Sequence, residues 1–186
     1  YPFQSIRPFF CQVEAVEAAI WLAEVAPHSA QGKETLDLLQ GASEQANPEL
    51  MRIALKLATG AGKTTVMAML IAWQTINAVR HPRSRAFTRG FLIVTPGITI
   101  RDRLQVVQPN HPENYYKKRD LLPPDLIGRL TRANIEIISY HKLMRRKDPN
   151  APSKLGQELL NPDGENDPFL ETPEQMVSRV CATFGN

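Results

Sequence analysis

The chain has 186 residues, of which 42% are hydrophobic and 22% charged, and this length and composition fit one globular α/β domain. Lys and Arg number 22 against 19 Asp and Glu, a net charge of +3 that permits nucleic-acid partners without requiring them. No apolar run reaches the length of a membrane span, so we expect no membrane partner. Two cysteines, Cys11 and Cys181, suit a reducing compartment, and we expect partly buried free thiols in a cytoplasmic protein.

The first half of the chain predicts two helices, a strand and a third helix. Residues 12–25 carry apolar residues at helical spacing, and residues 33–47 predict a second, shorter helix before a proline. Residues 52–58 alternate large apolar with smaller or polar residues, as a half-buried strand does. Residues 63–80 are apolar, rich in helix formers and free of proline, so we expect a helix there.

The second half predicts two further strands, FLIVT at 91–95 and IEIIS at 135–139. The sequence ITIRDRLQVV, which follows the first of them, favours a helix, whereas the polar, proline-bearing residues 107–125 predict an irregular insertion. Residues 151–171 are typical of a loop or of partial disorder. A Thr-Pro-Glu-Gln sequence then predicts a closing helix over 172–182.

Strands that alternate with helices imply a parallel sheet with right-handed crossovers. Ligands of such sheets bind beyond the C-terminal ends of the strands. The candidate functional loops are therefore residues 59–64, 96–103 and 139–147.

The sequence LATGAGKTT at 57–65 lies between a predicted strand and a predicted helix, where a helix N-terminus offers unpaired N–H groups and partial positive charge to a polyphosphate. Gly60 and Gly62 allow a tight turn, Lys63 can reach the β- and γ-phosphates, and the Thr64 hydroxyl can bind Mg²⁺. The full pattern has a further glycine five residues before Gly62, so only its shorter core is present. The alternative is a glycine-rich turn with a solvated lysine. The residues expected to hold the phosphates are Thr59, Gly60, Ala61, Gly62, Lys63, Thr64 and Thr65.

These motifs resemble the first motor domain of a superfamily 2 helicase or translocase, closest to the helicase-like subunits of type III and type I restriction enzymes. LATGAGKT resembles the first motif of that superfamily, and RPFFCQVEAVEAAIWL at 7–22 resembles its glutamine motif. FLIVTPGITIRDRL at 91–104 resembles motif Ia, and IEIISYHKLM at 135–144 resembles motif Ib. The resemblance implies an α/β, P-loop, RecA-like three-layer fold with a parallel sheet.

The resemblance also implies ATP and Mg²⁺ as cofactors. Lys63 would stabilise charge on the transferred phosphoryl group, and Gln12 would read adenine, because an amide both donates and accepts. The alternative for Gln12 is a solvated residue at the head of a helix. Phe9 or Phe10 would stack on the base, although phenylalanines are more often core residues.

Four basic residues follow the two predicted strands on the ligand edge. They are Arg101, Arg103, Lys142 and Arg145. We expect them to contact nucleic-acid phosphates, with a solvated surface as the alternative. Arg83 and Arg85 precede a strand, so we expect those two to form a solvated surface.

The chain departs from the family pattern because it contains no Asp-Glu pair and no Ser-Ala-Thr motif. We therefore expect an N-terminal fragment. Residues 1–144 would form part of the ATP-binding domain, with the glutamine motif in 1–26, and residues 145–186 a polar loop and closing helix. The parent would be a DNA-dependent ATPase of a restriction system with DNA and a methyltransferase subunit as partners, and the fragment alone would be inactive. The alternatives are a small-molecule or nucleotide kinase and a non-catalytic nucleotide-binding adaptor.

Overall fold

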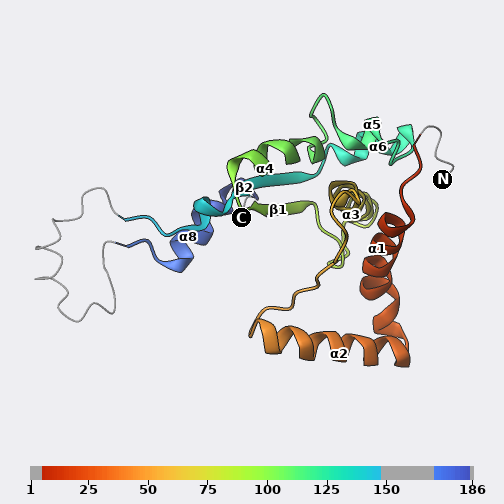
Figure 1. Ribbon diagram of the computed structural model, residues 1–186, viewed down its shortest axis with the longest axis horizontal. Helices are drawn as coiled ribbons and strands as arrows, with labels where there is room; N and C mark the ends of the chain where they lie inside the picture. Colours follow the sequence, from red (N-terminus) through yellow and green to blue (C-terminus); the bar gives the residue numbers. More distant parts are fainter. Residues whose placement is uncertain (1–5, 148–169, 185–186) are drawn as a thin grey trace, which may run out of the picture. The chain divides into compact units, whose positions relative to one another are not determined.

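The computed structural model describes residues 6–147 and 170–184, and Figure 1 traces its helices and strands. The chain divides into two compact units: Tyr1–Thr88 with Val106–Arg132, and Arg89–Gln105 with Ala133–Asn186. The boundary expected between residues 144 and 145 stays a prediction. No helix among the described residues is long and apolar enough to cross a membrane.

The first unit opens with two helices joined by a tight corner. α1 (Phe10–Ile20) continues through a π-helical turn (Trp21–Val25) and a 3₁₀ turn (Ala26–His28) into α2 (Ala30–Ala46). Ser29 caps α2, because its hydroxyl accepts the N–H of Gly32 at 3.0 Å. Both predicted helices are confirmed. Cys11, predicted to be partly buried, lies exposed in the first turn of α1, whereas Cys181 is half-buried, and both are free thiols.

α3 (Lys63–Arg80) follows the glycine-rich loop and confirms the predicted helix 63–80. α1, α5 (Tyr115–Lys118) and α6 (Pro124–Leu130) contact it. Its buried positions recur at three- and four-residue intervals, the spacing of one helical face. They are Thr65, Val66, Ala68, Ile71, Ala72, Thr75 and Ile76.

The strand predicted over 52–58 does not form. The segment carries no strand pairing, and Ile53 is exposed while Leu55 and Leu57 are half-buried. Its start is tied instead to α2, because the Ser43 hydroxyl accepts the N–H of Arg52 at 2.9 Å. The alternation of apolar residues predicts which side chains share a face, but a strand also needs a neighbour for its backbone groups. The two strands of the described residues pair with each other and not with this segment.

The insertion predicted as irregular over 107–125 is partly helical. It contains all of α5 and the start of α6, and its first residue ends a 3₁₀ turn (Leu104–Val107). Tyr116 is 1% exposed, and its hydroxyl donates to the carbonyl oxygen of Val107 at 2.7 Å. Burial raises the pKa of this phenol, so the hydroxyl keeps its proton for that hydrogen bond. A buried aromatic residue therefore holds together a segment whose prolines suggested no regular structure.

The second unit contains a parallel pair of strands, β1 (Gly90–Thr95) and β2 (Asn134–Ser139), at the predicted places. They pair in register from Gly90 opposite Asn134 to Thr95 opposite Ser139. α4 (Ile98–Arg103) contacts both strands, as expected for a crossover helix. Three of the β2 side chains that line the core are isoleucines: Ile135, Ile137 and Ile138. The mixture of helices with a parallel sheet confirms the α/β class.

The predicted closing helix is α8 (Pro173–Val180). Its capping box is complete, because the Thr172 hydroxyl accepts the N–H of Gln175 at 3.2 Å and the Gln175 side chain accepts the N–H of Thr172 at 2.9 Å. Arg179 anchors the helix to the 3₁₀ turn (Tyr140–Leu143) after β2, with Nη1 donating to the carbonyl oxygen of Lys142 at 2.9 Å. Most of the loop predicted over 151–171 lies outside the described residues.

Candidate functional site

The glycine-rich loop adopts a left-handed turn at two positions. Gly60 has φ 83° and Gly62 has φ 77°, a region that residues with a Cβ rarely adopt. Hydrogen bonds from Ala61 N–H to Ala58 O (3.3 Å) and from Thr65 N–H to Gly62 O (2.8 Å) close the turn. Gly62 is the N-cap of α3, so the first-turn N–H groups of the helix lie directly after the loop.

Lys63 is exposed at the first position of α3, and its Nζ donates to the carbonyl oxygen of Ala58 at 2.9 Å. The ammonium group therefore folds back onto its own loop. An ammonium group has three donors, so this contact leaves two. Thr64 follows in the first turn, and its side chain has no protein hydrogen bond among the described residues.

Gln12 lies in the first turn of α1 and is 5% exposed, so the solvated alternative is wrong. Its Oε1 accepts the N–H of Phe9 at 3.0 Å, and its Nε2 donates to the carbonyl oxygen of Ala61 at 2.7 Å. The structure thus brings Gln12 to the glycine-rich loop, 49 residues along the chain. Each atom of the amide retains one further bonding capacity, a lone pair on the oxygen and a hydrogen on the nitrogen.

The same amide explains why a glycine is required at position 62. A Cβ built on Gly62 would lie 2.2 Å from Gln12 Nε2, well inside any tolerated contact. Gly60 has an equally left-handed φ, but a Cβ there would meet nothing within 4 Å. The loop and the Gln12 amide therefore pack so closely at position 62 that a side chain there would displace the amide.

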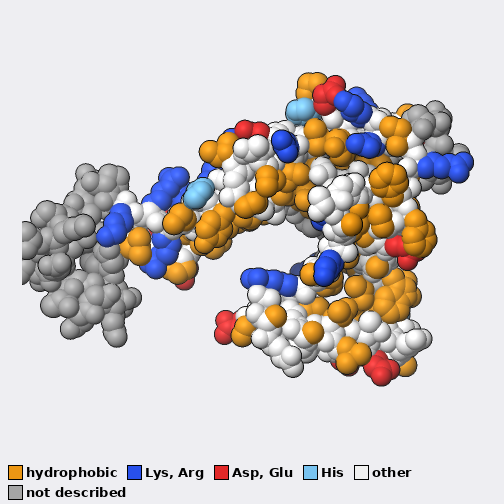
Figure 2. Space-filling view, viewed as in Figure 1, with side chains coloured by type: hydrophobic (Ala, Val, Ile, Leu, Met, Phe, Trp, Pro, Cys, Tyr) orange, Lys and Arg blue, Asp and Glu red, His pale blue; other side chains and the backbone are white. Residues whose placement is uncertain are grey.

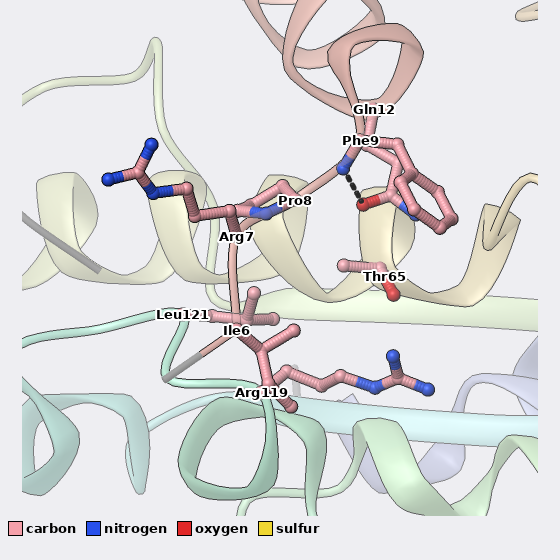
Figure 3. Close-up of a pocket in the computed structure, with 8 residues that line it drawn as sticks. All are labelled: Ile6, Arg7, Pro8, Phe9, Gln12, Thr65, Arg119 and Leu121. Carbon is pink, nitrogen blue, oxygen red and sulfur yellow. Dashed lines mark hydrogen bonds between the residues drawn. The ribbon is translucent and has the colours of Figure 1, made fainter. Parts of the chain in front are cut away.

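A pocket lies between the start of α1, the start of α3 and the segment after α5, and its empty volume of about 330 Å³ includes open solvent. Its lining residues, drawn in Figure 3, are Ile6, Arg7, Pro8, Phe9, Gln12, Thr65, Arg119 and Leu121. Phe9 is 62% exposed and Phe10 is 79% exposed, so neither is the core residue that its type favours. Sequence reasoning did not predict the contribution of Arg119 and Leu121, because they lie in the segment predicted as irregular.

The four predicted nucleic-acid residues all belong to the second unit and lie on the segments that follow β1 and β2. Because Thr95 and Ser139 are opposite each other in parallel strands, the segments after β1 and β2 leave from the same edge. Figure 2 shows Lys and Arg side chains around α8 and the segment after β2.

Three of these four cations already have protein partners. Arg101 pairs with Asp102 at 2.8 Å, Lys142 pairs with Glu136 at 3.2 Å, and Arg145 Nε donates to the carbonyl oxygen of Glu171. Arg103 is exposed and forms no ion pair among the described residues. Exposed ion pairs contribute little free energy, so these side chains remain able to exchange their partners for phosphates.

No group of three or more His, Cys, Asp or Glu side chains in the described ranges is arranged to hold a metal ion.

The α/β fold with a left-handed glycine turn at the head of a helix defines a P-loop domain. The family model of the type III restriction enzyme, res subunit, matches residues 5–168. The chain belongs to this family, and its domain is a helicase-like ATPase motor domain. Comparisons with curated proteins and with solved structures gave no significant match.

Proposed function

We propose that this chain is the ATP-binding portion of a DNA-dependent ATPase. The observation that carries the proposal is the hydrogen bond from Gln12 to Ala61, since it joins the glutamine segment to the phosphate loop. An amide fixed in this position and still able to donate and accept once has what is needed to pair with the edge of adenine. A small-molecule kinase would need an acceptor site, and the family membership favours the motor.

The proposed roles follow the chemistry of each group. Backbone N–H groups from Gly60 to Thr65 would surround the phosphates, those of Ala61 and Thr65 after leaving their carbonyl partners in the loop, and Thr59 would lie at the entry to the loop. Lys63 would leave Ala58 and neutralise charge on the β- and γ-phosphates, and the Thr64 hydroxyl would be a ligand of Mg²⁺. When bound, Mg²⁺ would stabilise negative charge on the phosphate oxygens.

The nucleic acid in this proposal is DNA, and its biological setting is a restriction system. The family name supports a restriction context, and the basic edge formed by Arg101, Arg103, Lys142 and Arg145 suits a phosphate backbone. A methyltransferase subunit would be the partner protein, and the cytoplasm the compartment in which such a system meets DNA.

The test is calorimetric titration of Mg-ATP, followed by a phosphate-release assay, on the chain and on Lys63→Ala. We expect the variant to lose most of its affinity, by about tenfold or more, because a charge-assisted contact is removed. We also expect no phosphate release above background from either form, since the sequence holds no Asp-Glu pair to position Mg²⁺ and water.

Equal affinities of the two forms for ATP would refute the phosphate-loop assignment. ATP binding without turnover is also what a non-catalytic adaptor would show. DNA-stimulated phosphate release that Lys63→Ala abolishes would instead show that the chain hydrolyses ATP by itself.

A further inference from the structure

The segment from Asn114 to Leu121 is built to a fixed shape. Asn114 is 5% exposed and caps α5, because its Oδ1 accepts the N–H of Lys117 at 3.1 Å while its Nδ2 donates to His111 O at 2.9 Å. The buried Tyr116 hydroxyl fastens the same turn to Val107. A short polar segment held by buried side chains is more ordered than a solvated loop of the same composition.

The chain reverses directly after α5. Asp120 has φ 49°, in the left-handed region, and the N–H of Leu121 returns to the carbonyl oxygen of Tyr116 at 3.0 Å. This turn brings both Arg119 and Leu121 to the pocket that Phe9 and Gln12 line. A non-glycine residue in this conformation costs free energy, so the surrounding contacts must hold the turn in place.

Arg119 is a half-buried cation whose guanidinium carbon lies 4.9 Å from the centre of the Tyr115 ring. It forms no ion pair with a described carboxylate, and no acidic residue lines the pocket. Figure 3 shows its guanidinium on the same side as the Thr65 hydroxyl and the Phe9 ring, whereas the guanidinium of Arg7 points away from them. In that view the Thr65 side chain lies between the Phe9 ring and the guanidinium of Arg119.

We propose that Arg119 is a nucleotide-binding residue and that its guanidinium packs against the base, on the face opposite Phe9. This inference rests on the proposed function. Gln12 would then contact the edge of a base held between an aromatic ring and a guanidinium plane. Guanidinium groups stack on π-systems through their flat face, and a lysine ammonium cannot reproduce this contact. The insertion between the two strands thus contributes a wall of the nucleotide pocket.

The experiment compares two probes, Mg-ATP and inorganic Mg-tripolyphosphate, which lacks the nucleoside. Both are titrated calorimetrically into the wild-type chain, Arg119→Ala, Arg119→Lys, Lys63→Ala and Arg129→Ala. Arg129 is the matched control, because it is an exposed arginine of α6 outside the pocket.

We expect Arg119→Ala to weaken ATP binding by about tenfold and to leave tripolyphosphate binding unchanged, which also shows that the variant folds. Arg119→Lys should restore little of the loss, since it returns the charge without the plane. Lys63→Ala should lose affinity for both probes, and Arg129→Ala should match the wild type.

Three results would overturn the inference. If Arg119→Ala binds ATP as the wild type does while Lys63→Ala does not, Arg119 is no nucleotide contact although the phosphate loop is correctly assigned. If Arg119→Ala weakens both probes equally and Arg119→Lys restores both, the residue contacts phosphate and not the base. If the wild type binds neither probe, the proposed function fails and this inference fails with it.

Discussion

At the scale of single residues, Gln12 and Gly62 depend on each other. The Gln12 amide reaches Ala61 only because position 62 has no Cβ, which would lie 2.2 Å from Nε2. A larger residue at position 62 would have to displace the amide as well as adopt a left-handed φ of 77°. The shape of the phosphate loop and the position of the glutamine are thus fixed by one close contact.

Glu171 holds α8 through its charge. Its carboxylate accepts from Arg179 Nε and Nη2, both at 2.7 Å, and from the N–H of Arg146 at 3.1 Å. The hydrogen bond from Arg179 is the main cause that lowers its pKa to about 2, from a usual value near 4.3. Because the folded pKa is lowered, this stabilisation is complete above the unfolded pKa and is lost as the pH falls through the folded one.

We therefore predict that α8 loosens between about pH 4.3 and about pH 2. The measurement is thermal unfolding from pH 7 to pH 2, with hydrogen exchange of the α8 amides at the same pH values. Glu171→Gln should show weaker protection at pH 7 and little further change over that window. Glu14→Gln, on the exposed side of α1, is the control and should follow the wild type. Identical pH curves for Glu171→Gln and the wild type would show that this carboxylate does not hold the helix.

At the scale of elements, the corner between α1 and α2 has no room for a side chain. A Cβ on Gly32 would lie 2.3 Å from the carbonyl oxygen of Ala26 and 2.4 Å from its Cα. Ala26 is itself completely buried, so the backbone cannot yield toward solvent. A Cβ on Gly41, in the same helix, would meet nothing within 4 Å.

Gly32→Ala should therefore destabilise the chain by about 1–3 kcal/mol, the usual cost of overpacking. Gly41→Ala should stabilise it by about 0.5–1 kcal/mol, because alanine loses less backbone entropy in a helix. Urea denaturation of both variants measures the two free energies of unfolding. A Gly32→Ala variant as stable as the wild type would mean that the corner relaxes easily, and a more stable one would rule out the close contact.

A helix or strand is predicted well from the sequence when its hydrogen bonds lie within its own segment, and less well when they depend on a distant partner. α3 follows from local pattern, because the hydrogen bonds of a helix lie within its own segment. β1 and β2 carry strongly β-forming residues, and each also has the other strand as its hydrogen-bonding partner. Residues 52–58 have the strand pattern without a described partner, and α5 depends on the buried Tyr116, which no local periodicity indicates.

Some parts of the candidate site also follow from local sequence, whereas others depend on how distant segments pack. The composition of the loop predicts a turn at Gly60 and Gly62, since only glycine accepts these dihedrals without strain. Its glutamine partner follows from the family motif, but the bond to Ala61 requires the packing of α1 on α3. Arg119 reaches the pocket through a left-handed turn at an aspartate, and nothing in the surrounding sequence marks that turn.

At the scale of the whole molecule, the two proposed ligands belong to different units. The phosphate loop, Gln12 and the pocket are all in the first unit, and the basic edge that follows β1 and β2 is in the second. A change on one surface should therefore leave binding at the other intact, provided that the chain stays folded. This separation makes the two halves of the proposed function independently testable.

The prediction is that single-stranded DNA binding depends on the second unit. Replacing Arg101 and Arg103 of α4 by alanine should weaken DNA binding and flatten its salt dependence by about one unit per lost phosphate contact. ATP affinity should stay unchanged, because neither side chain belongs to the phosphate loop or its pocket. Lys63→Ala should have the opposite effect: its affinity for ATP should fall and its affinity for DNA should stay unchanged.

The matched control removes the same charge elsewhere. Arg83 and Arg85 are exposed and precede β1, so their double alanine variant has the same net charge as the α4 variant without altering the edge. Fluorescence anisotropy with a labelled oligonucleotide, over a series of salt concentrations, compares all four proteins. If the Arg83 and Arg85 variant loses as much DNA affinity as the α4 variant, binding follows net charge alone. If it loses more, the DNA lies elsewhere on the chain. Removing an arginine weakens binding specifically only where that arginine contacts a phosphate.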